Sequence, residues 1–321
     1  MPDLLVLGQV TVDHAVPATP GPWRASLGGN ALYAAAGARL WCDPGRVGVV
    51  TRLGRGLAAD VTAILGRAGL PTGGLTEVDA EPLIEWHLYE QDGSRRSFPR
   101  NAALRDPTAD AATLHQRYLA HLEGLSPTAA DIPRAWLPTR AVHVAPQVSA
   151  RHESTIAWLA ERADWVGVDP SPHYASHLKE GRLMDMLRGA RAFLPSRAEV
   201  AHLVPDGDWV GLIGRLREAG FEEVVVKLGG AGCLVAGPGV ESPRRIPAAS
   251  ADVVDLTGAG DAFCGAYAAA RLGGLDPLTA GRRGAIAAAM VIECTGAAAA
   301  LALSPDEAER RLGAWIAGAQ R

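Results

Sequence analysis

The stretch Asp255-Leu256-Thr257-Gly258-Ala259-Gly260-Asp261 runs directly into the small-residue segment Ala262-Phe263-Cys264-Gly265-Ala266, which has a helical pattern. A Gly-Ala-Gly turn that opens a helix leaves backbone N–H groups unpaired at the positive end of the helix dipole. Glycine tolerates the positive φ of such a turn and lets an anion approach without interference from a Cβ atom. The stretch therefore predicts a phosphate-sized anion site built from Gly258, Ala259 and Gly260.

Acidic residues flank this turn. Asp261 stands at the start of the helix, where the dipole stabilises a carboxylate that can accept a proton from an attacking hydroxyl. Asp255 and Thr257 offer oxygen ligands that could hold a cation beneath the loop. The alternative is a plain tight turn in which Asp261 only caps the helix.

Away from this stretch, short apolar runs alternate with longer Ala- and Leu-rich patterns, which is typical of parallel strands joined by crossover helices. The expected core strands are Leu4–Leu7, Arg46–Val50, Ala141–Ala145, Trp165–Val168, Ala192–Leu194 and Glu223–Lys227. The expected helices are Ala31–Leu40, Leu57–Ala68, Ser154–Ala163, Trp209–Ala219, Ala262–Leu272, Pro277–Glu293 and Pro305–Ala317. We therefore expect an α/β fold with a mostly parallel central sheet flanked by helices.

One segment breaks this alternation. Leu83–Tyr89 has the pattern of a half-exposed strand, Gln91-Asp92-Gly93-Ser94 has hairpin-turn chemistry, and Arg95–Phe98 returns as a strand. With Val10–Val16 these runs predict a small antiparallel sheet, whose strands fall within about 10–22 and 79–100. That sheet is a lid, a clasp that pairs with a second copy of the chain, or a surface hairpin without function. Residues Ala102–Thr139 are expected to be a connection of helix and loop.

Composition excludes several classes of protein. The chain has 321 residues and a formal net charge of −4, without a basic run that would neutralise DNA or RNA phosphates. The two lysines, Lys179 and Lys227, do not stand in a Gly-Lys-Ser/Thr sequence, so no Walker A loop is present. No stretch is apolar enough to span a membrane, and we expect a cytoplasmic protein. The widely spaced Cys42, Cys233, Cys264 and Cys294 are expected to be reduced and structural.

The chain resembles the PfkB/ribokinase-like carbohydrate kinases, whose signature Asp-Thr-x-Gly-Ala-Gly-Asp is similar to the stretch Asp255–Asp261. Further motifs stand in the family's order, and the resemblance covers nearly the whole chain. They are Gly8–Asp13, Gly28-Gly29-Asn30, Asp169-Pro170-Ser171, Leu194–Glu199 and Val226–Gly232. The resemblance implies a single three-layer α/β kinase domain over 1–321 with a small β lid.

The resemblance also implies roles for phosphoryl transfer from ATP. Asp261 would take the proton from the acceptor hydroxyl, while the amides of Gly258, Ala259 and Gly260 stabilise charge on the γ-phosphoryl group. Glu199 would orient water around Mg²⁺. Asp255 and Thr257 match positions that bind a monovalent cation such as K⁺ in several members. The implied ATP-binding residues are Ser196, Lys227, Gly229, Gly232 and Gly260.

The implied acceptor is a hydroxyl group of a small sugar, polyol or nucleoside. The residues that would bind it are Asp13, Gly29, Asn30 and Tyr33, with Gln147 as a further candidate. Tyr33, Trp86 and Tyr89 are aromatic candidates for the wall on the acceptor side. Several of these residues also have a purely structural alternative. Asp13 could be an ordinary loop carboxylate, Asn30 could cap a helix, and Glu199 could be a glutamate favoured in the first turn of a helix. Lys227 could stand at a strand end with its ammonium group in solvent.

Several positions depart from the family pattern, namely Thr11, Tyr33, Ser171, Ser196 and Leu256. The phenol of Tyr33 stands where an asparagine amide is usual, which narrows the pocket and disfavours ribose. Two other functions stay open. The chain could be a catalytically weak regulator that binds a sugar or nucleotide, or a kinase of a non-sugar alcohol such as a vitamin precursor.

Overall fold

A nine-stranded sheet forms the centre of the computed structural model, which describes residues 1–16, 24–89, 95–99, 104, 106, 108–204 and 206–319. The strand order is β13-β12-β11-β10-β9-β8-β1-β4-β5. Every neighbouring pair from β5 to β11 is parallel, and β12 and β13 add an antiparallel edge. The strands are β1 (Leu4–Leu7), β4 (Val47–Leu53), β5 (Leu75–Glu77), β8 (Thr139–Val144), β9 (Ala163–Val168), β10 (Ala192–Phe193), β11 (Glu223–Lys227), β12 (Cys233–Gly237) and β13 (Val240–Ile246).

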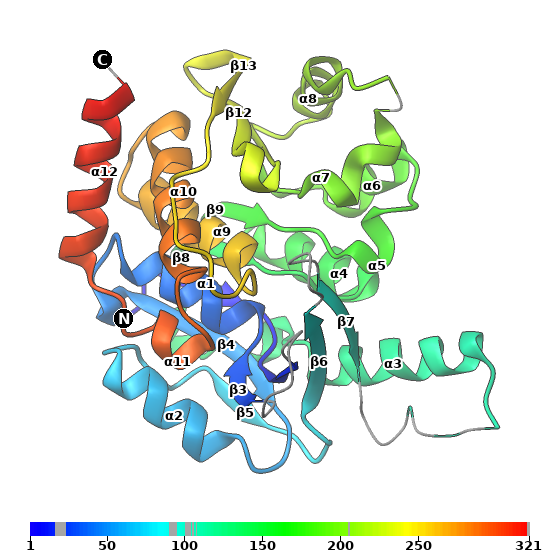
Figure 1. Cartoon of the computed structure of the whole chain (residues 1–321). Coiled ribbons are helices and arrows are strands. Elements are labelled where there is room, and N and C mark those ends of the chain that lie inside the picture. Colours follow the sequence, from blue (N-terminus) through cyan, green and yellow to red (C-terminus); the bar gives the residue numbers. More distant parts are fainter. Residues whose placement is uncertain are drawn as a thin grey trace.

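Helices cover both faces of this sheet, which confirms the three-layer α/β arrangement (Figure 1). Successive residues of a strand point to opposite faces, so Leu4 and Val6 enter one apolar core while Leu5 and Leu7 enter the other. The first face carries α1 (Asn30–Arg39), α2 (Ala58–Arg67), α9 (Ala259–Leu272), α10 (Pro277–Val291), α11 (Ala297–Ala300) and α12 (Pro305–Ala319). The second carries α4 (Ser149–Leu159), α5 (Pro172–Ala175), α6 (Glu180–Met186), α7 (Arg197–Val200) and α8 (Trp209–Glu218).

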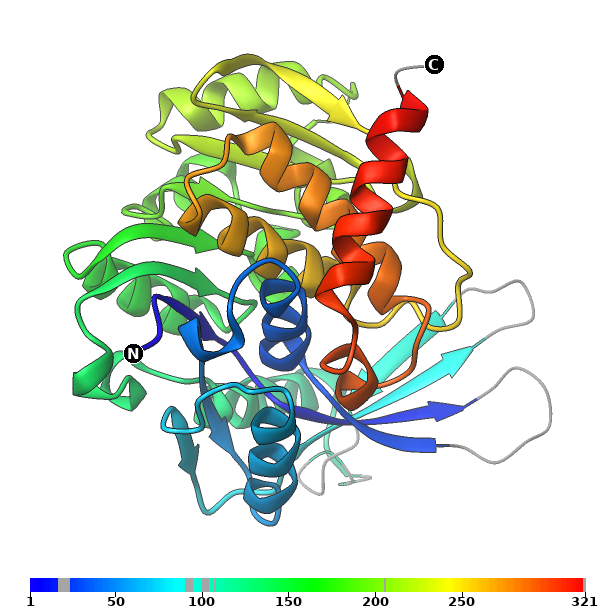
Figure 2. The ribbon, with the colours of Figure 1, turned by 90° about the vertical axis from the view of Figure 1, so that its left-hand side faces the viewer.

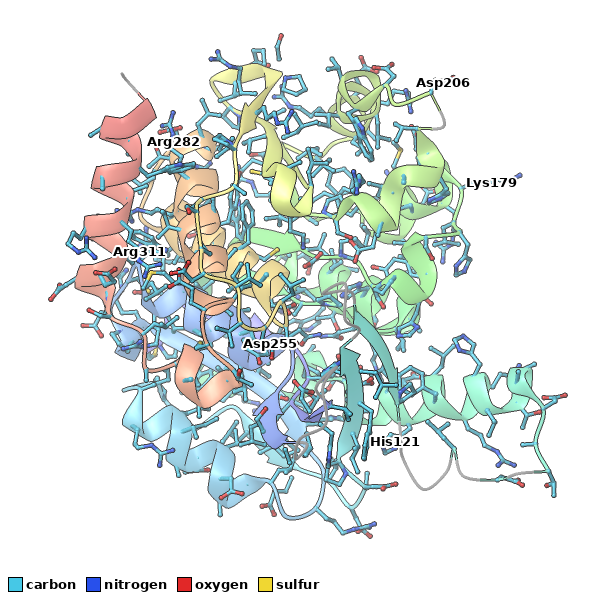
Figure 3. The ribbon with its side chains drawn as sticks, in the orientation of Figure 1. His121, Lys179, Asp206, Asp255, Arg282 and Arg311 are labelled. Carbon is cyan, nitrogen blue, oxygen red and sulfur yellow. The ribbon has the colours of Figure 1, made fainter. Side chains whose placement is uncertain are left out.

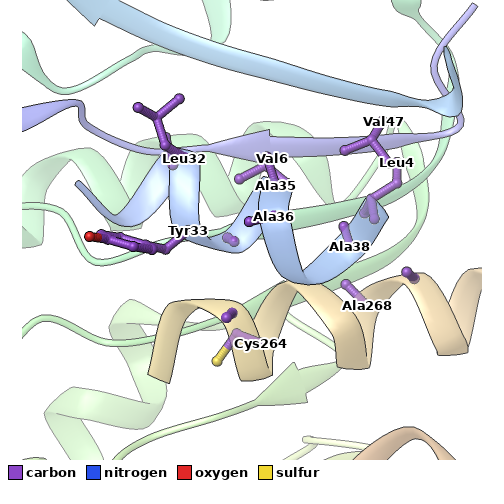
Figure 4. Packing of buried hydrophobic residues seen from close by; sticks show 14 of the residues in the cluster. Leu4, Val6, Leu32, Tyr33, Ala35, Ala36, Ala38, Val47, Cys264 and Ala268 are labelled. Carbon is purple, nitrogen blue, oxygen red and sulfur yellow. The ribbon is translucent and has the colours of Figure 1, made fainter. Parts of the chain in front are cut away.

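Helices α1 and α9 pack unusually closely because their facing residues are alanine and glycine (Figure 4). A Cβ atom on Gly265 of α9 would stand 1.8 Å from the carbonyl oxygen of Ala34. A Cβ atom on Gly37 of α1 would stand 2.0 Å from the carbonyl oxygen of Ala262. The two helices therefore meet backbone against backbone, and their amino ends are held side by side.

The expected small sheet is present and stands off the central one (Figure 2). Its order is β3 (Arg24–Gly28), β2 (Thr11–Val16), β6 (Leu83–Tyr89) and β7 (Arg95–Pro99). The outer pairs are antiparallel, but β2 and β6 run parallel in the middle. Strand β3 was not expected, and the proposed turn at 91–94 lies outside the described residues. We call this four-stranded sheet the lid sheet.

The expected helices and strands are found with a few differences. Helix α4 begins and ends earlier than the expected Ser154–Ala163, because the chain is already in β9 at Ala163. Helix α9 begins at Ala259 rather than Ala262, because Gly258 supplies the left-handed residue that precedes it. The connection 102–139 contains one long helix, α3 (Ala111–Leu125). None of the helices in the described part of the chain is long and apolar enough to cross a membrane.

Candidate active site

The predicted anion site is formed by the start of α9. Gly258 has φ 80° and ψ 0°, and its carbonyl accepts the first helical hydrogen bond from Ala262 N–H at 2.9 Å. The amides of the three residues between them precede any acceptor within the helix and are directed toward its amino end. The loop ahead is fixed, since Val254 N–H and Asp255 N–H both donate to the carbonyl of Ile292 at 2.8 and 3.0 Å. The backbone amides thus form a fixed cradle that carries positive potential.

Asp261 lies in the first turn of α9, beside this cradle. Burial raises the pKa of its carboxyl group to about 6, with Glu199 and Asp13 adding to the rise and Lys227 opposing it. The carboxyl group therefore titrates near neutral pH rather than in acid. That pKa suits a general base, which must be ionised yet able to hold a proton.

Lys227 enters the site from the end of β11. Its backbone N–H donates to Pro195 O at 2.8 Å, and its ammonium group contacts the Asp169 carboxylate and lies 3.3 Å from Cys264 Sγ. A Cβ atom on Gly260 would stand 3.6 Å from Lys227 Nζ, so the ammonium lies next to the anion cradle. Burial alone would lower the pKa of Lys227, but the carboxylates of Asp169 and Glu199 raise it above its ordinary value. The side chain is therefore charged and does not extend into solvent.

Glu199 is buried near Lys227 and takes part in a helix cap. Its Oε2 accepts a hydrogen bond from Ser196 N–H at 2.6 Å, and the two residues form a capping box at the start of α7. Burial raises the pKa of Glu199, against the opposing effects of Lys227 and Ser196. Ser171 likewise caps α5 by accepting from His173 N–H at 3.3 Å. Both serines that depart from the family pattern therefore cap helices.

Gly229 and Gly232, which are predicted to bind the nucleotide, lie in the turn between β11 and β12. Gly232 has φ 87°, and a Cβ atom there would stand 2.0 Å from Ile246 O, so only glycine fits. Gly229 has φ 61° and no atom within 4 Å of its would-be Cβ, which leaves the turn open on that side.

Asp255 Oδ1 accepts from Thr257 N–H at 2.8 Å, so the two candidate cation ligands are neighbours in the loop near the middle of the molecule (Figure 3).

Asp13 occupies the lid-sheet side of the site. It is 6% exposed, its Oδ1 accepts from Thr11 Oγ1 at 2.6 Å, and His87 Nε2 lies 3.6 Å from the same oxygen. A Cβ atom on Gly28 would stand 1.8 Å from Asp13 Oδ2, which explains the glycine there. Asp13 also raises the pKa of both Tyr33 and Asp261, so these three residues converge on one region.

Tyr33 lies between the anion cradle and Asp13. Its ring packs against Gly258, and burial, followed by Asp13, Asp255, Cys294 and Asp261, raises the pKa of its hydroxyl group. The phenol is therefore neutral and able to donate a hydrogen bond.

The remaining predicted acceptor residues are Asn30, Gly29 and Gln147. Asn30 Oδ1 accepts from Gln9 N–H at 2.7 Å, and Asn30 Nδ2 donates to Gln9 Oε1 at 3.2 Å and Pro146 O at 2.9 Å. Its amide therefore ties the end of β1 and the loop after β8 to α1. Gly29 has φ 97° at the cap of α1. Gln147 is fully buried, and its amide atoms have no hydrogen-bond partner among the described residues.

The lid-sheet aromatics do not share the face of Asp13. Trp86 pairs with His14 across β2 and β6, and their rings stack at 4.9 Å with an interplanar angle of 6°. Adjacent residues of a strand point to opposite faces, so Trp86 and Asp13 lie on opposite sides of the sheet. The place of Trp86 in the wall on the acceptor side stays a prediction. The side chain of Tyr89 lies outside the described part.

Sequence reasoning did not single out His87 or give Asp169 a role. Asp169 could have been found from strand geometry. Asp169 directly follows β9 and Lys227 ends β11, with β10 between them in a parallel sheet. The carboxyl ends of parallel strands meet at one edge, so a carboxylate and an ammonium group there become neighbours.

Comparisons with known proteins identify the family. The model of the pfkB family carbohydrate kinases matches residues 1–303, and the chain therefore belongs to that family. It is 36% identical over 150 residues to an uncharacterized sugar kinase of Archaeoglobus fulgidus, covering 46% of this chain and 58% of that protein. It is 41% identical over 88 residues to the 2-dehydro-3-deoxygluconokinase of Escherichia coli K12, covering 27% of this chain and 28% of that one.

The fold is also shared with solved structures. Arabidopsis thaliana ribokinase, complexed with ribose and ATP, superposes with a TM-score of 0.71 at 18% identity, covering 97% of this chain and 98% of that one. The chain therefore has the ribokinase fold. The curated sugar kinases are matched over little more than half their length or less.

Proposed function

We propose that the protein is an ATP-dependent kinase that transfers the γ-phosphoryl group to a hydroxyl group of a small sugar, polyol or nucleoside. The observation that carries the proposal is the placement of Asp261 beside the Gly258–Gly260 amide cradle, with Asp13 and Tyr33 converging from the acceptor side. A base and an anion site that meet at one point are what transfer to an alcohol requires. The family membership and the ribose and ATP bound by the Arabidopsis ribokinase support the same reaction.

In the proposed step the acceptor oxygen attacks the γ-phosphorus, the bond from that phosphorus to the bridging oxygen of ADP breaks, and the hydroxyl proton passes to Asp261. The Ala259 and Gly260 amides stabilise negative charge on the transferred group. Asp13 accepts a hydrogen bond from an acceptor hydroxyl and orients it. The neutral phenol of Tyr33 limits the width of the pocket beside Gly258.

The donor set of the site suits cations. Asp169 contacts the ammonium group of Lys227, and Glu199 and Asp261 lie near enough for the charge of Lys227 to act on their pKa. Each of the three carboxyl groups has a raised pKa with burial as the first cause. Glu199 would hold Mg²⁺ through water, and Asp255 with Thr257 would hold K⁺ beneath the loop. Mg²⁺ would supply charge neutralisation for the phosphates when bound. The proposal includes a cytoplasmic location, where ATP is the phosphoryl donor.

The lid sheet enters the proposal in two ways. It closes over the acceptor to exclude water, which would otherwise compete for the phosphoryl group. Its outer face, which carries the stacked His14 and Trp86 pair, is the surface through which two copies would form a homodimer. Light scattering after gel filtration distinguishes a dimer from a monomer.

The test of the proposed function is ATP consumption by purified protein over a panel of sugars, polyols, nucleosides and vitamin-precursor alcohols, with Asp261→Asn as control. Acceptor-dependent formation of ADP that the variant lacks is the expected result. Nucleotide binding without turnover on any acceptor would favour the regulator instead.

A further inference from the structure

A buried group of polar residues lies directly beneath the anion cradle. Asp169 and Lys227 form an ion pair whose side chains are 4% and 12% exposed. Cys264, in the second turn of α9, donates to Asp169 Oδ2 at 3.4 Å and lies 3.3 Å from Lys227 Nζ. A buried ion pair is expensive to desolvate and adds little to stability on its own. Its position therefore calls for an explanation other than folding.

The pair points its positive end at the cradle. Lys227 Nζ would be 3.6 Å from a Cβ atom on Gly260, while Asp169 approaches the ammonium from the end of β9. Gly260 has no side chain and so places no side-chain atoms of its own between the ammonium and the cradle. Asp169 and Cys264 thus fix the ammonium in a place that a flexible lysine would not keep unaided.

We propose that Asp169 is a positioning residue that holds the Lys227 ammonium beneath Gly260, so that the anion cradle carries a full positive charge besides its backbone amides. The inference rests on the proposed function, since the charge acts on the γ-phosphoryl group in that cradle. The predicted role of Lys227 was to line the nucleotide. The inference adds that Asp169 fixes the position of its charge.

The electrostatics of the neighbouring groups agree with this geometry. Lys227 is the cation that opposes the raised pKa of Asp169, Glu199 and Asp261 alike. His143, fully buried on β8, does not supply a second cation, because burial, Lys227 and His152 lower its pKa to about 3. Removing the lysine would leave three carboxyl groups facing the phosphates without this compensation.

The test compares Lys227→Met, Asp169→Asn and the double variant, with Lys179→Met as matched control. Lys179, the other lysine, projects into solvent at the rim of the molecule (Figure 3). The readouts are kcat and KM for ATP, the Kd of the Mg²⁺ complex of a non-hydrolysable ATP analogue, and the midpoint of thermal unfolding. The analogue measures affinity without turnover.

We expect Lys227→Met to weaken analogue binding about tenfold and to lower kcat by about 100-fold, the size of loss seen when one stabilising group is removed from an anion hole. Asp169→Asn should lower kcat with little loss of analogue affinity, because the lysine remains but is no longer held. The double variant removes both charges of the Asp169–Lys227 pair, so it should regain part of the thermal stability lost in Lys227→Met and keep the low kcat and weak binding.

A double variant that recovers the parent's kcat and analogue affinity would overturn the inference, because Lys227 would then only neutralise Asp169. A parent-like kcat in Asp169→Asn would overturn the positioning role. If the parent phosphorylates no acceptor, the proposed function fails, and the analogue Kd values alone decide: equal affinity in the parent and the double variant also overturns the inference.

Discussion

The ring of Tyr33 lies directly against Gly258, so that a Cβ atom on Gly258 would come within 2.2 Å of Tyr33 Cγ. This contact joins the acceptor side of the site to the turn that opens the anion cradle. Gly258 also has φ 80°, a conformation that residues with a Cβ atom rarely adopt. Backbone conformation and close packing therefore both require glycine at this position.

Gly258→Ala is expected to lower kcat by about 100-fold, because the turn must shift and the cradle amides with it. Gly239→Ala is the matched control, since Gly239 has φ 76° in the turn between β12 and β13 but nothing within 4 Å of its would-be Cβ. Each variant should lose about 1–2 kcal/mol of unfolding free energy from the positive φ. Steady-state kinetics check the difference, and equal activity in the two variants would contradict it.

Asp261→Asn is expected to lower kcat by about 100- to 10,000-fold, because the amide cannot take the hydroxyl proton. Its thermal stability should not fall, since the substitution removes a buried carboxyl group whose pKa is raised. Asp110→Asn, at the exposed cap of α3, is the control and should retain parental kinetics. A variant at Asp261 as active as the parent would refute its role as the base.

The pH dependence of kcat follows from the same residue. The pKa of Asp261 is raised to about 6, so the base is protonated and inactive below that pH and ionised above it. We expect kcat to increase as pH rises through about 6 and then to level off, measured between pH 5 and 8 at saturating ATP and acceptor. A kcat that is flat over this range would show that no group with this pKa controls the step.

Tyr33 should govern which acceptors fit. Tyr33→Ala would empty the space beside Gly258, and we expect it to widen the range of accepted alcohols and to destabilise the fold by about 3 kcal/mol. Tyr33→Phe keeps the ring against Gly258 and should keep the parent's order of preference. The measurement is relative kcat/KM over the acceptor panel, and an unchanged order in Tyr33→Ala would rule out this role.

Asn30 offers a test between a structural and a substrate-binding role. Its amide makes three hydrogen bonds to Gln9 and Pro146, so Asn30→Ala should cost about 1–3 kcal/mol of unfolding free energy by leaving buried groups unpaired. Chemical denaturation measures this loss. Unchanged stability together with a raised KM for the acceptor would instead place Asn30 in direct contact with substrate.

Much of the fold could be predicted because the signals were local. Strands β1 and β11 occur at the expected residues, since each is an apolar run bounded by polar residues. Helix α4 was displaced because its buried side, with His152, Thr155, Ile156 and Leu159, mixes polar with apolar residues and weakens the periodicity. Strand β3 was missed although it pairs with the nearby β2, because its sequence, RASLG, holds a single large apolar residue and shows no clear strand pattern.

Site residues that are close in sequence could be grouped in advance, whereas those that only the fold brings together could not. Gly258, Asp261 and Asp255 lie within one short stretch, so their grouping could be predicted directly from it. Asp169 and Lys227 are 58 positions apart, and their contact depends on strand order rather than sequence spacing. Asn30 kept an ambiguous role because only the structure shows its bonds to Gln9 and Pro146.

The contact between α1 and α9 has a mechanical consequence. No methyl group fits at Gly37 or Gly265, so neither helix can slide or roll against the other without a collision of main-chain atoms. The turn at the head of α1 and the turn at the head of α9 must then travel as one body. In the proposed reaction, opening and closing would therefore fall to other segments, and the packing of α1 against α9 would set the distance between the acceptor and the phosphorus atom.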